Sequence, residues 1–260
     1  MGGVYGFEVD DEFATYVIRE TQPIGVDDGA AILGDAGGNI LSANEMELTL
    51  AGIAASDYDF TEVGQAVKSG DTATIGFWQN KNGQALIKQG GPGLATWLSD
   101  NFGNVFGSTF TDGMGDDADE VASFYKKEFF KKKLKGTSKV DAQFMATAFA
   151  AYFTSSNLSG GTVAASYGFH ITTETGIGTK VVSVGSSGLA FGVADNTDMT
   201  IMALLLATDS FTGVDNGTNN GITDTDDNSY SNVYDANGDG VLDDAEKAMR
   251  ALANVVYTDD

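Results

Sequence analysis

Residues Asp235 to Glu246 read D-A-N-G-D-G-V-L-D-D-A-E, and this stretch organises the C-terminal part of the chain. Oxygen-bearing groups recur along it, at positions one, three, five, seven, nine and twelve. These candidate ligands are Asp235, Asn237, Asp239, the backbone carbonyl of Val241, Asp243 and Glu246. A hard cation such as Ca²⁺ binds six to eight oxygen atoms, so the spacing predicts a calcium site.

The same stretch contains the turn and the apolar anchor that such a site needs. Gly240, at position six, permits a sharp turn, and Leu242, at position eight, is expected to point into the core. Residues 244–256 have apolar side chains at helical spacing and predict a helix that leaves the loop. Together these features match an EF-hand calcium loop, in which Glu246 is the bidentate closing ligand. The alternative is an Asp/Gly-rich turn that binds no metal.

Composition bounds the class of protein. The chain has 260 residues, of which 42% are hydrophobic, so it can bury a sizeable core in one or two domains. The lack of cysteine excludes disulfides and thiolate metal sites. A net charge of −23 argues against a nucleic-acid partner. The longest apolar run, residues 199–207, is too short for a membrane span, and without a signal peptide we expect a part of a longer secreted protein.

Charge divides the chain into an acidic N-terminal part, a nearly neutral middle and an acidic C-terminal part. Residues 1–67 contain 13 acidic and one basic residue, residues 68–210 contain 13 and 11, and residues 211–260 contain 11 and two. We therefore expect a β domain over 1–67 and an α+β main domain over 68–212. Residues 213–260 then form an acidic loop, the calcium loop and a terminal helix.

Local patterns support this mixed α+β class. Alternating apolar and β-branched residues predict strands at 15–19 and 47–53 in the N-terminal part. In the middle, apolar residues at helical spacing predict helices at 94–102, 119–135 and 140–155.

Further local features predict where elements begin. Ser138 and Asp141 form an S-x-x-D capping pattern at the start of the helix over 140–155. Beyond that helix, we expect strands at 162–172, 179–184 and 189–194, separated by Gly-rich turns, and then a helix capped by Thr197.

The N-terminal region resembles a known adhesin repeat. Its segments Y5-G-F, A14-T-Y-V-I-R-E-T-Q-P-I-G and Y58-D-F-T-E-V are similar to the later half of the B-type repeats of serine-aspartate-rich surface adhesins. Those repeats are related to the B repeats of collagen adhesins, and the resemblance implies a small β-sandwich-like fold. The strands and the calcium loop with which such repeats begin are missing here, so the resemblance is to a partial repeat. Three explanations stay open: the sequence starts inside the repeat, a partner supplies the missing edge, or the module has been remodelled.

The middle region resembles a module found near the C-terminal ends of large multidomain extracellular proteins of environmental bacteria. The matching segments are T74-I-G-F-W-Q-N-K-N-G-Q-A-L-I-K, L94-A-T-W-L-S-D-N-F, D141-A-Q-F-M-A-T-A-F-A-A-Y, A165-S-Y-G-F and M202-A-L-L-L-A. The resemblance implies a secreted, cell-surface or matrix location. It implies no catalytic residues.

The pattern for catalysis is weak. His170 is the single histidine, and its alternating surroundings are more typical of a structural residue. Gly185-Ser186-Ser187-Gly188 differs from a nucleophile elbow and has the composition of a hairpin turn. Paired carboxylates for glycoside chemistry are uninformative in a chain with 37 acidic residues. We therefore expect no enzyme activity.

Other clusters have two interpretations each. Residues Asp112–Glu120 form a second calcium site or cap a helix, and capping is favoured because no glutamate stands at a closing position. Asp224–Asn228 has D-x-D-x-N spacing but lacks the turn glycine, so it is a weak auxiliary site.

Basic and aromatic residues are also ambiguous. Seven lysines between Lys126 and Lys139 form a solvated helix face or a docking patch for an acidic partner. Trp78, Trp97, Phe77 and Tyr125 suit the core better than a sugar-stacking platform.

Taken together, the sequence predicts a calcium-binding, non-catalytic module of a bacterial surface protein that serves spacing, attachment or assembly. Calcium is one expected partner. The other is a neighbouring copy or module of the same surface protein, or alternatively a surface glycan. Two alternatives remain open: a dockerin-like docking module, and a carbohydrate-binding module or carbohydrate-active enzyme.

Overall fold

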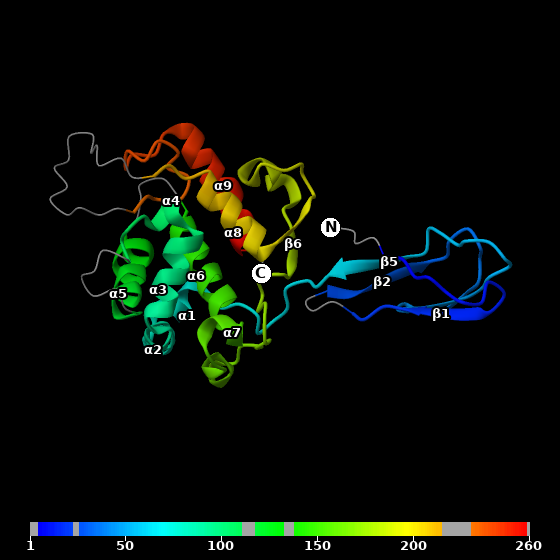
Figure 1. Cartoon of the computed structure of the whole chain (residues 1–260). Coiled ribbons are helices and arrows are strands. Elements are labelled where there is room, and N and C mark those ends of the chain that lie inside the picture. Colours follow the sequence, from blue (N-terminus) through cyan, green and yellow to red (C-terminus); the bar gives the residue numbers. More distant parts are fainter. Residues whose placement is uncertain (1–4, 23–25, 111–117, 133–137, 215–229, 259–260) are drawn as a thin grey trace. The chain divides into compact units, whose positions relative to one another are not determined.

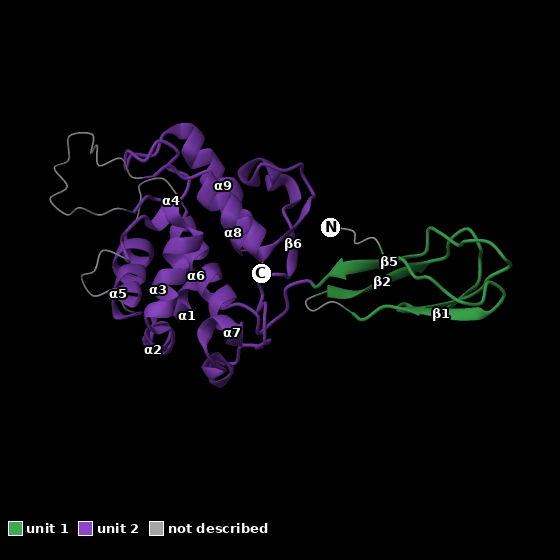
Figure 2. Cartoon of the chain, viewed as in Figure 1, with its two compact units in different colours: residues 1–65 green, residues 66–260 purple. Residues whose placement is uncertain are grey.

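The computed structural model describes residues 5–22, 26–110, 118–132, 138–214 and 230–258 (Figure 1). The chain divides into two compact units, Met1–Gln65 and Ala66–Asp260 (Figure 2). This boundary lies close to the expected one at residue 67, and the acidic C-terminal region belongs to the second, main unit. Helices and small antiparallel sheets are both present, so the α+β class is confirmed.

The first unit is built from strands. They are β1 (Thr15–Arg19), β2 (Val26–Ile32), β3 (Asn39–Ser42), β4 (Glu45–Thr49) and β5 (Asp59–Gly64). Strands β1, β4 and β3 form one antiparallel sheet in that order, and β2 pairs with β5 in another. The strand predicted at 15–19 is confirmed. The strand predicted at 47–53 begins earlier and ends at Thr49, where its partner β1 begins opposite it at Thr15.

The core of the first unit is small. Alternate residues of β4, Met46 and Leu48, are buried together with Ala31 of β2 and with Tyr58. These side chains come from both sheets and form one cluster. The period of two in the sequence therefore arises from strands with one buried face.

The main unit is built mostly from helices. They are α1 (Ile75–Gln79), α2 (Lys81–Gln89), α3 (Gly91–Asn101), α4 (Gly103–Phe106), α5 (Ala118–Phe124), α6 (Val140–Phe153), α7 (Ser156–Ser159), α8 (Ile201–Ser210) and α9 (Asp244–Thr258). A π-helix (Tyr125–Lys131) directly follows α5, and two 3₁₀ helices cover Val163–Tyr167 and Gly185–Phe191. Strands β6 (Val181–Ser183) and β7 (Asp198–Thr200) pair antiparallel. None of the helices described has the length and apolar character that crossing a membrane requires.

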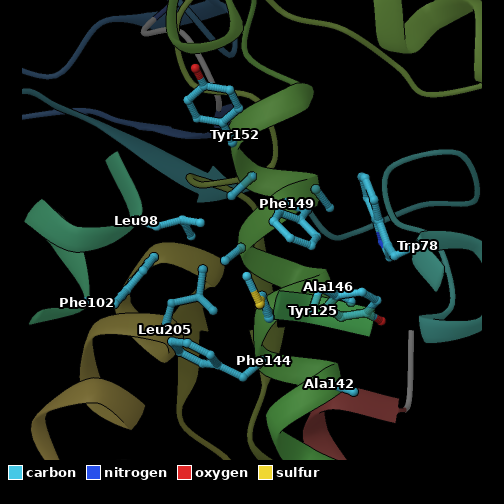
Figure 3. Packing of buried hydrophobic residues seen from close by; sticks show 14 of the residues in the cluster. Trp78, Leu98, Phe102, Tyr125, Ala142, Phe144, Ala146, Phe149, Tyr152 and Leu205 are labelled. Carbon is cyan, nitrogen blue, oxygen red and sulfur yellow. The ribbon is translucent and has the colours of Figure 1, made fainter. Parts of the chain in front are cut away.

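Helix α6 is the centre of the main unit. Nearly all of its residues are buried, and Figure 3 shows Phe144 and Phe149 pointing from it among other buried side chains. The ring of Phe149 lies 5.1 Å from that of Trp78, centroid to centroid, and Phe144 lies 5.2 Å from Phe102. A helix that is apolar on nearly every side is stable only when neighbours cover those sides.

The aromatic residues weighed as a sugar platform belong to this core, as predicted. Trp78 and Tyr125 are fully buried. Phe77 and Trp97 are partly buried and pack against the same cluster. A platform for a sugar ring needs exposed faces, so these four side chains do not form one.

Several predicted elements are wrong. Residues 163–167 and 185–191 form 3₁₀ helices in place of a strand and a hairpin turn, and Gly168 and Gly192 end them at φ of +93° and +69°. The predicted strand at 189–194 falls on the second of these helices. The alternation around Phe169 reflects packing against the core instead of strand pairing. Of these predicted strands, the one at 179–184 is confirmed as β6.

Helix beginnings also differ from the prediction. Thr200, not Thr197, caps α8, because its Oγ1 accepts a hydrogen bond from the Ala203 N–H at 3.1 Å. Lys139 is the N-cap of α6 and makes no side-chain cap, so the Ser138–Asp141 capping pattern is wrong. Asp141 instead accepts the Val233 N–H at 2.9 Å. The predicted helix over 119–135 changes from α to π geometry at Tyr125.

Candidate calcium site

The predicted calcium loop lies between Tyr234 and α9, and all six candidate ligands are described. Its first half is organised by the carboxylate of Asp235. The Gly240 N–H donates to Asp235 Oδ2 at 2.8 Å, and the Asp239 N–H donates to Oδ1 at 3.2 Å. Gly240 has a φ of +72°, so the glycine predicted at the turn takes a conformation that other residues rarely adopt.

The second half of the loop is organised by Glu246 in the first turn of α9. Its Oε2 accepts the Asp243 N–H at 2.7 Å, while the Glu246 N–H donates to Asp243 Oδ1 at 2.8 Å. This reciprocal pair is a capping box that starts the helix. Glu246 Oε1 also accepts the Ala236 N–H at 2.8 Å, so Glu246 joins the end of the loop to its beginning. Leu242 is buried, as expected for the anchor.

The site concentrates negative charge around Asp235. Burial raises the pKa of the Asp235 carboxyl above its ordinary value, and the nearby charges of Glu246 and Asp239 raise it further. Hydrogen bonds from the Gly240 and Asp239 backbone oppose the shift but do not cancel it. A cation placed among these groups would remove the repulsion that this burial creates.

The residues fit an oxygen-bound cation. Each carboxylate oxygen of Asp235 and Glu246 accepts a backbone N–H, and each keeps acceptor capacity for a metal. Within the described residues, no three His, Cys, Asp or Glu side chains converge as a ready metal-binding group. Glu246 accepts hydrogen bonds from the backbone amides of Ala236 and Asp243, and two of the six candidate ligands, Asn237 and the Val241 carbonyl, are amide oxygens. Asp235, Asn237, Asp239, Val241, Asp243 and Glu246 would hold the ion.

The loop begins at a buried segment, residues 231–235, which we call the strap. The Ser231 N–H donates to the Val105 carbonyl at 2.8 Å, and the Val233 N–H donates to Asp141 Oδ1 at 2.9 Å. The Tyr234 N–H donates to Thr212 Oγ1 at 3.0 Å. The strap is thus tied to several elements of the main unit just before the first candidate ligand.

Arg250 connects the strap to α9 and α6. Its guanidinium is fully buried, and Nη1 donates to Asp141 Oδ1 at 2.9 Å and to the Val233 carbonyl at 2.5 Å. Sequence reasoning missed this residue, because its partner Asp141 lies 109 positions away. On α9 the apolar spacing does not fully mark the buried face, because Val255 is exposed. The buried residues are Glu246, Arg250, Ala253, Val256 and Tyr257.

His170 lies against a buried carboxylate. Its side chain is 66% exposed, and its Nδ1 lies 3.2 Å from Asp71 Oδ1. Lys180 Nζ donates to the other oxygen of Asp71 at 2.5 Å. Ser186, in the second 3₁₀ helix, is exposed. These contacts are compatible with the predicted structural role of His170, and both that role and the expected lack of enzyme activity stay predictions.

The two further acidic clusters fall largely outside the described residues. Asp224–Asn228 lies there entirely, as do Asp116 and Asp117 of the cluster Asp112–Glu120. Asp119 is described, stands in the first turn of α5 and forms an ion pair with Lys88.

The lysine-rich stretch is partly engaged within the main unit. Lys139 Nζ donates to the Phe130 carbonyl at 2.6 Å and lies over the Phe130 ring. Lys132 Nζ donates to the Tyr230 hydroxyl at 3.0 Å. Lys127 and Lys131 are exposed. The solvated face and the docking patch thus both stay open as interpretations.

Comparison with known proteins identifies no relative. The chain matches no protein-family model, no curated protein and no solved structure. The resemblances to adhesin repeats and to the extracellular module therefore stay predictions from sequence.

Proposed function

We propose that this chain is a non-catalytic, calcium-stabilised structural module of a large extracellular bacterial surface protein. The observation that supports this most directly is the contact of Glu246 Oε1 with the Ala236 N–H at 2.8 Å. It brings the first turn of α9 to the end of the strap, beside Asp235. An ion shared by Asp235 and Glu246 would fasten α9 to the body of the main unit.

Coupling to the whole fold follows from the neighbours of the loop. The Asp235 carbonyl accepts the Gly213 N–H at 2.8 Å, and Arg250 holds the strap from the other side. An ion that binds the folded loop but not the unfolded chain stabilises everything to which the loop is tied. Calcium would then act as the cross-link of a chain without cysteine.

The first unit supports the adhesive part of the proposal. Its two small sheets share a cluster of side chains, which is compatible with a β-sandwich-like spacer. Residues 1–67 contain 13 acidic residues and one basic residue, so calcium and other cations would lower their mutual repulsion in an extracellular medium. Neighbouring copies, other modules or surface glycans are the partners that this role implies.

Thermal unfolding tests the calcium cross-link. The protein is melted in EDTA and in ~5 mM Ca²⁺, several times the dissociation constant of about 10⁻⁴–10⁻³ M typical of extracellular modules. We expect a higher midpoint in Ca²⁺, with a smaller rise in Mg²⁺. An unchanged midpoint would refute the proposal that calcium cross-links the fold. The dockerin-like alternative would then become the better explanation of the loop.

A further inference from the structure

A cleft of about 500 Å³ opens beside α6 in the main unit, away from the calcium loop. Three parts of the chain line it: the segment 67–75, one side of α6, and the end of α9 at Tyr257 and Thr258. Cavities of about 300–1,000 Å³ are typical of small-molecule sites. The cleft therefore has room for one small ligand.

Two polar side chains of α6, which we call the floor of the cleft, line it on a helix most of whose other residues are buried. Gln143 and Thr147 stand four residues apart on α6, so they share one face. Both are half-buried, and neither side chain is hydrogen-bonded to any residue that the structure describes. Most other residues of α6 pack into the core. On this helix, Gln143 therefore presents an amide to the cleft and Thr147 presents a hydroxyl.

The rim of the cleft is held in place by Asp71. Asp71 Oδ2 accepts the Lys68 N–H at 2.6 Å, and the Lys68 carbonyl accepts the Asp71 N–H at 3.0 Å. The His170 N–H donates to the Gly70 carbonyl at 2.8 Å, and a parallel bridge pairs Ala66 with Val181. A rim fixed before binding lowers the ordering cost that a ligand must overcome.

The lining selects a chemical class. Among the described residues that line it none carries a carboxylate, although the chain has 37 acidic residues. Its polar groups are mostly neutral, including the hydroxyls of Ser69, Thr72 and Thr147 and the amide of Gln143, and Lys68 is the one charged residue among those described. Apolar surface from Val67, Ile75, Ala146 and Tyr257 lies among them. Neutral donors and acceptors beside an apolar wall match the hydroxyls and the C–H faces of a sugar. The geometry points to a binding site for a small neutral saccharide in this cleft.

Saturation-transfer NMR on the full chain tests this site, with D-glucose, D-galactose, D-mannose and N-acetyl-D-glucosamine as probes. We expect at least one of the four to bind with a dissociation constant on the order of millimolar. Gln143→Leu and Thr147→Val should each weaken that binding about tenfold, because each leaves a sugar hydroxyl unpaired. Gln89→Leu on α2 and Thr173→Val, both exposed and outside the cleft, are matched controls that should bind as the wild type does.

Two results would overturn the inference. One is the lack of transfer to all four sugars at ~20 mM; the other is transfer that both cleft variants leave unchanged. Ser69→Ala on the rim serves as a further variant if a change on α6 prevents folding. D-Glucuronate is the anionic comparator: tighter binding than D-glucose would mean that Lys68 selects a carboxylate and that a neutral ligand is the wrong class. The calcium-dependent melt is independent of these readouts.

Discussion

Arg250 of α9 and Asp141 of α6 form an ion pair inside the main unit, with Nη1 and Oδ1 2.9 Å apart and the guanidinium fully buried. Asp141 also accepts the Val233 N–H, so three separate stretches of chain meet at one carboxylate. A buried charge is tolerated when its partner and its hydrogen bonds are present, and it is costly when they are removed.

This pair gives the first prediction. Arg250→Met should destabilise the protein by about 3–5 kcal/mol, because it leaves the buried Asp141 carboxylate uncompensated. The double variant Arg250→Met/Asp141→Asn should be less destabilised than the two single changes predict in sum, since the new amide is uncharged and keeps an acceptor oxygen for the Val233 N–H. Urea unfolding of the four proteins measures the coupling, and strict additivity would refute it.

Glu246→Gln tests the closing ligand of the calcium loop. The amide offers one oxygen where the carboxylate offers two, so we expect calcium affinity to fall roughly tenfold or more. Asp244→Asn is the matched control, because it removes the same charge from the same turn of α9 and its side chain is fully exposed. Calorimetric titration with Ca²⁺ compares the calcium affinities of the two variants. Equal losses of affinity would mean that the lost negative charge, and not a lost ligand, explains the effect of Glu246→Gln.

Gly213→Ala tests the packing of the loop against the end of α8. A Cβ at this position would lie 2.5 Å from the Ala236 carbonyl oxygen, so the loop must shift. We expect a loss of about 1–3 kcal/mol and weaker calcium binding. Gly103→Ala, where a Cβ meets nothing within 4 Å, should leave both unchanged. Thermal melts in Ca²⁺ and in EDTA would show the difference; a wild-type response of Gly213→Ala would contradict it.

The contacts of Asp71 indicate that it contributes to the free energy of unfolding and that this contribution is lost in acid. Burial by itself raises the pKa of Asp71, but hydrogen bonds from Lys180, the Lys68 N–H and His170 outweigh it and hold the pKa below its ordinary value. The folded state thus binds this proton more weakly than the unfolded state. The contribution is complete above the unfolded pKa of about 3.9 and is lost as the pH falls through the folded pKa.

Asp71→Asn should therefore lower stability at pH 7 and make the loss of stability below about pH 4 shallower. His170→Ala is the control, since its ring is mostly exposed and Lys180 still pairs with Asp71. It should change stability only slightly. Urea midpoints between about pH 2.5 and 7 give the comparison; parallel curves for Asp71→Asn and the wild type would contradict the assignment.

Local patterns predicted the elements whose apolar side chains repeat at helical spacing or whose turn needs a glycine. The helix expected over 140–155 is α6, and the loop glycine Gly240 makes the expected turn. The alternation near Phe169 was misleading, because it records which side chains are buried and not whether the backbone has a strand partner.

Contacts between residues far apart in the sequence produce no local sequence pattern that could predict them. Nothing near Asp141 distinguishes a helix cap from a partner of Arg250, which lies 109 residues away. The polar floor of the cleft could not be predicted from local sequence either. Gln143 and Thr147 can be recognised as cleft residues only once the structure shows that most other residues of α6 are buried. The ligand spacing of the loop was visible in sequence, whereas the strap that connects it to the core was not.

The fixed rim at residues 66–71 also lies where the chain enters the main unit. Ala66 pairs with Val181 in a parallel bridge, and Asp71 accepts a hydrogen bond from Lys180, the residue that precedes Val181 in the sequence. Tension applied to the chain from its N-terminal side reaches these contacts before it reaches α1. Under such a pull, the helices of the main unit would be loaded only after the Ala66–Val181 bridge and the Asp71–Lys180 ion pair have broken.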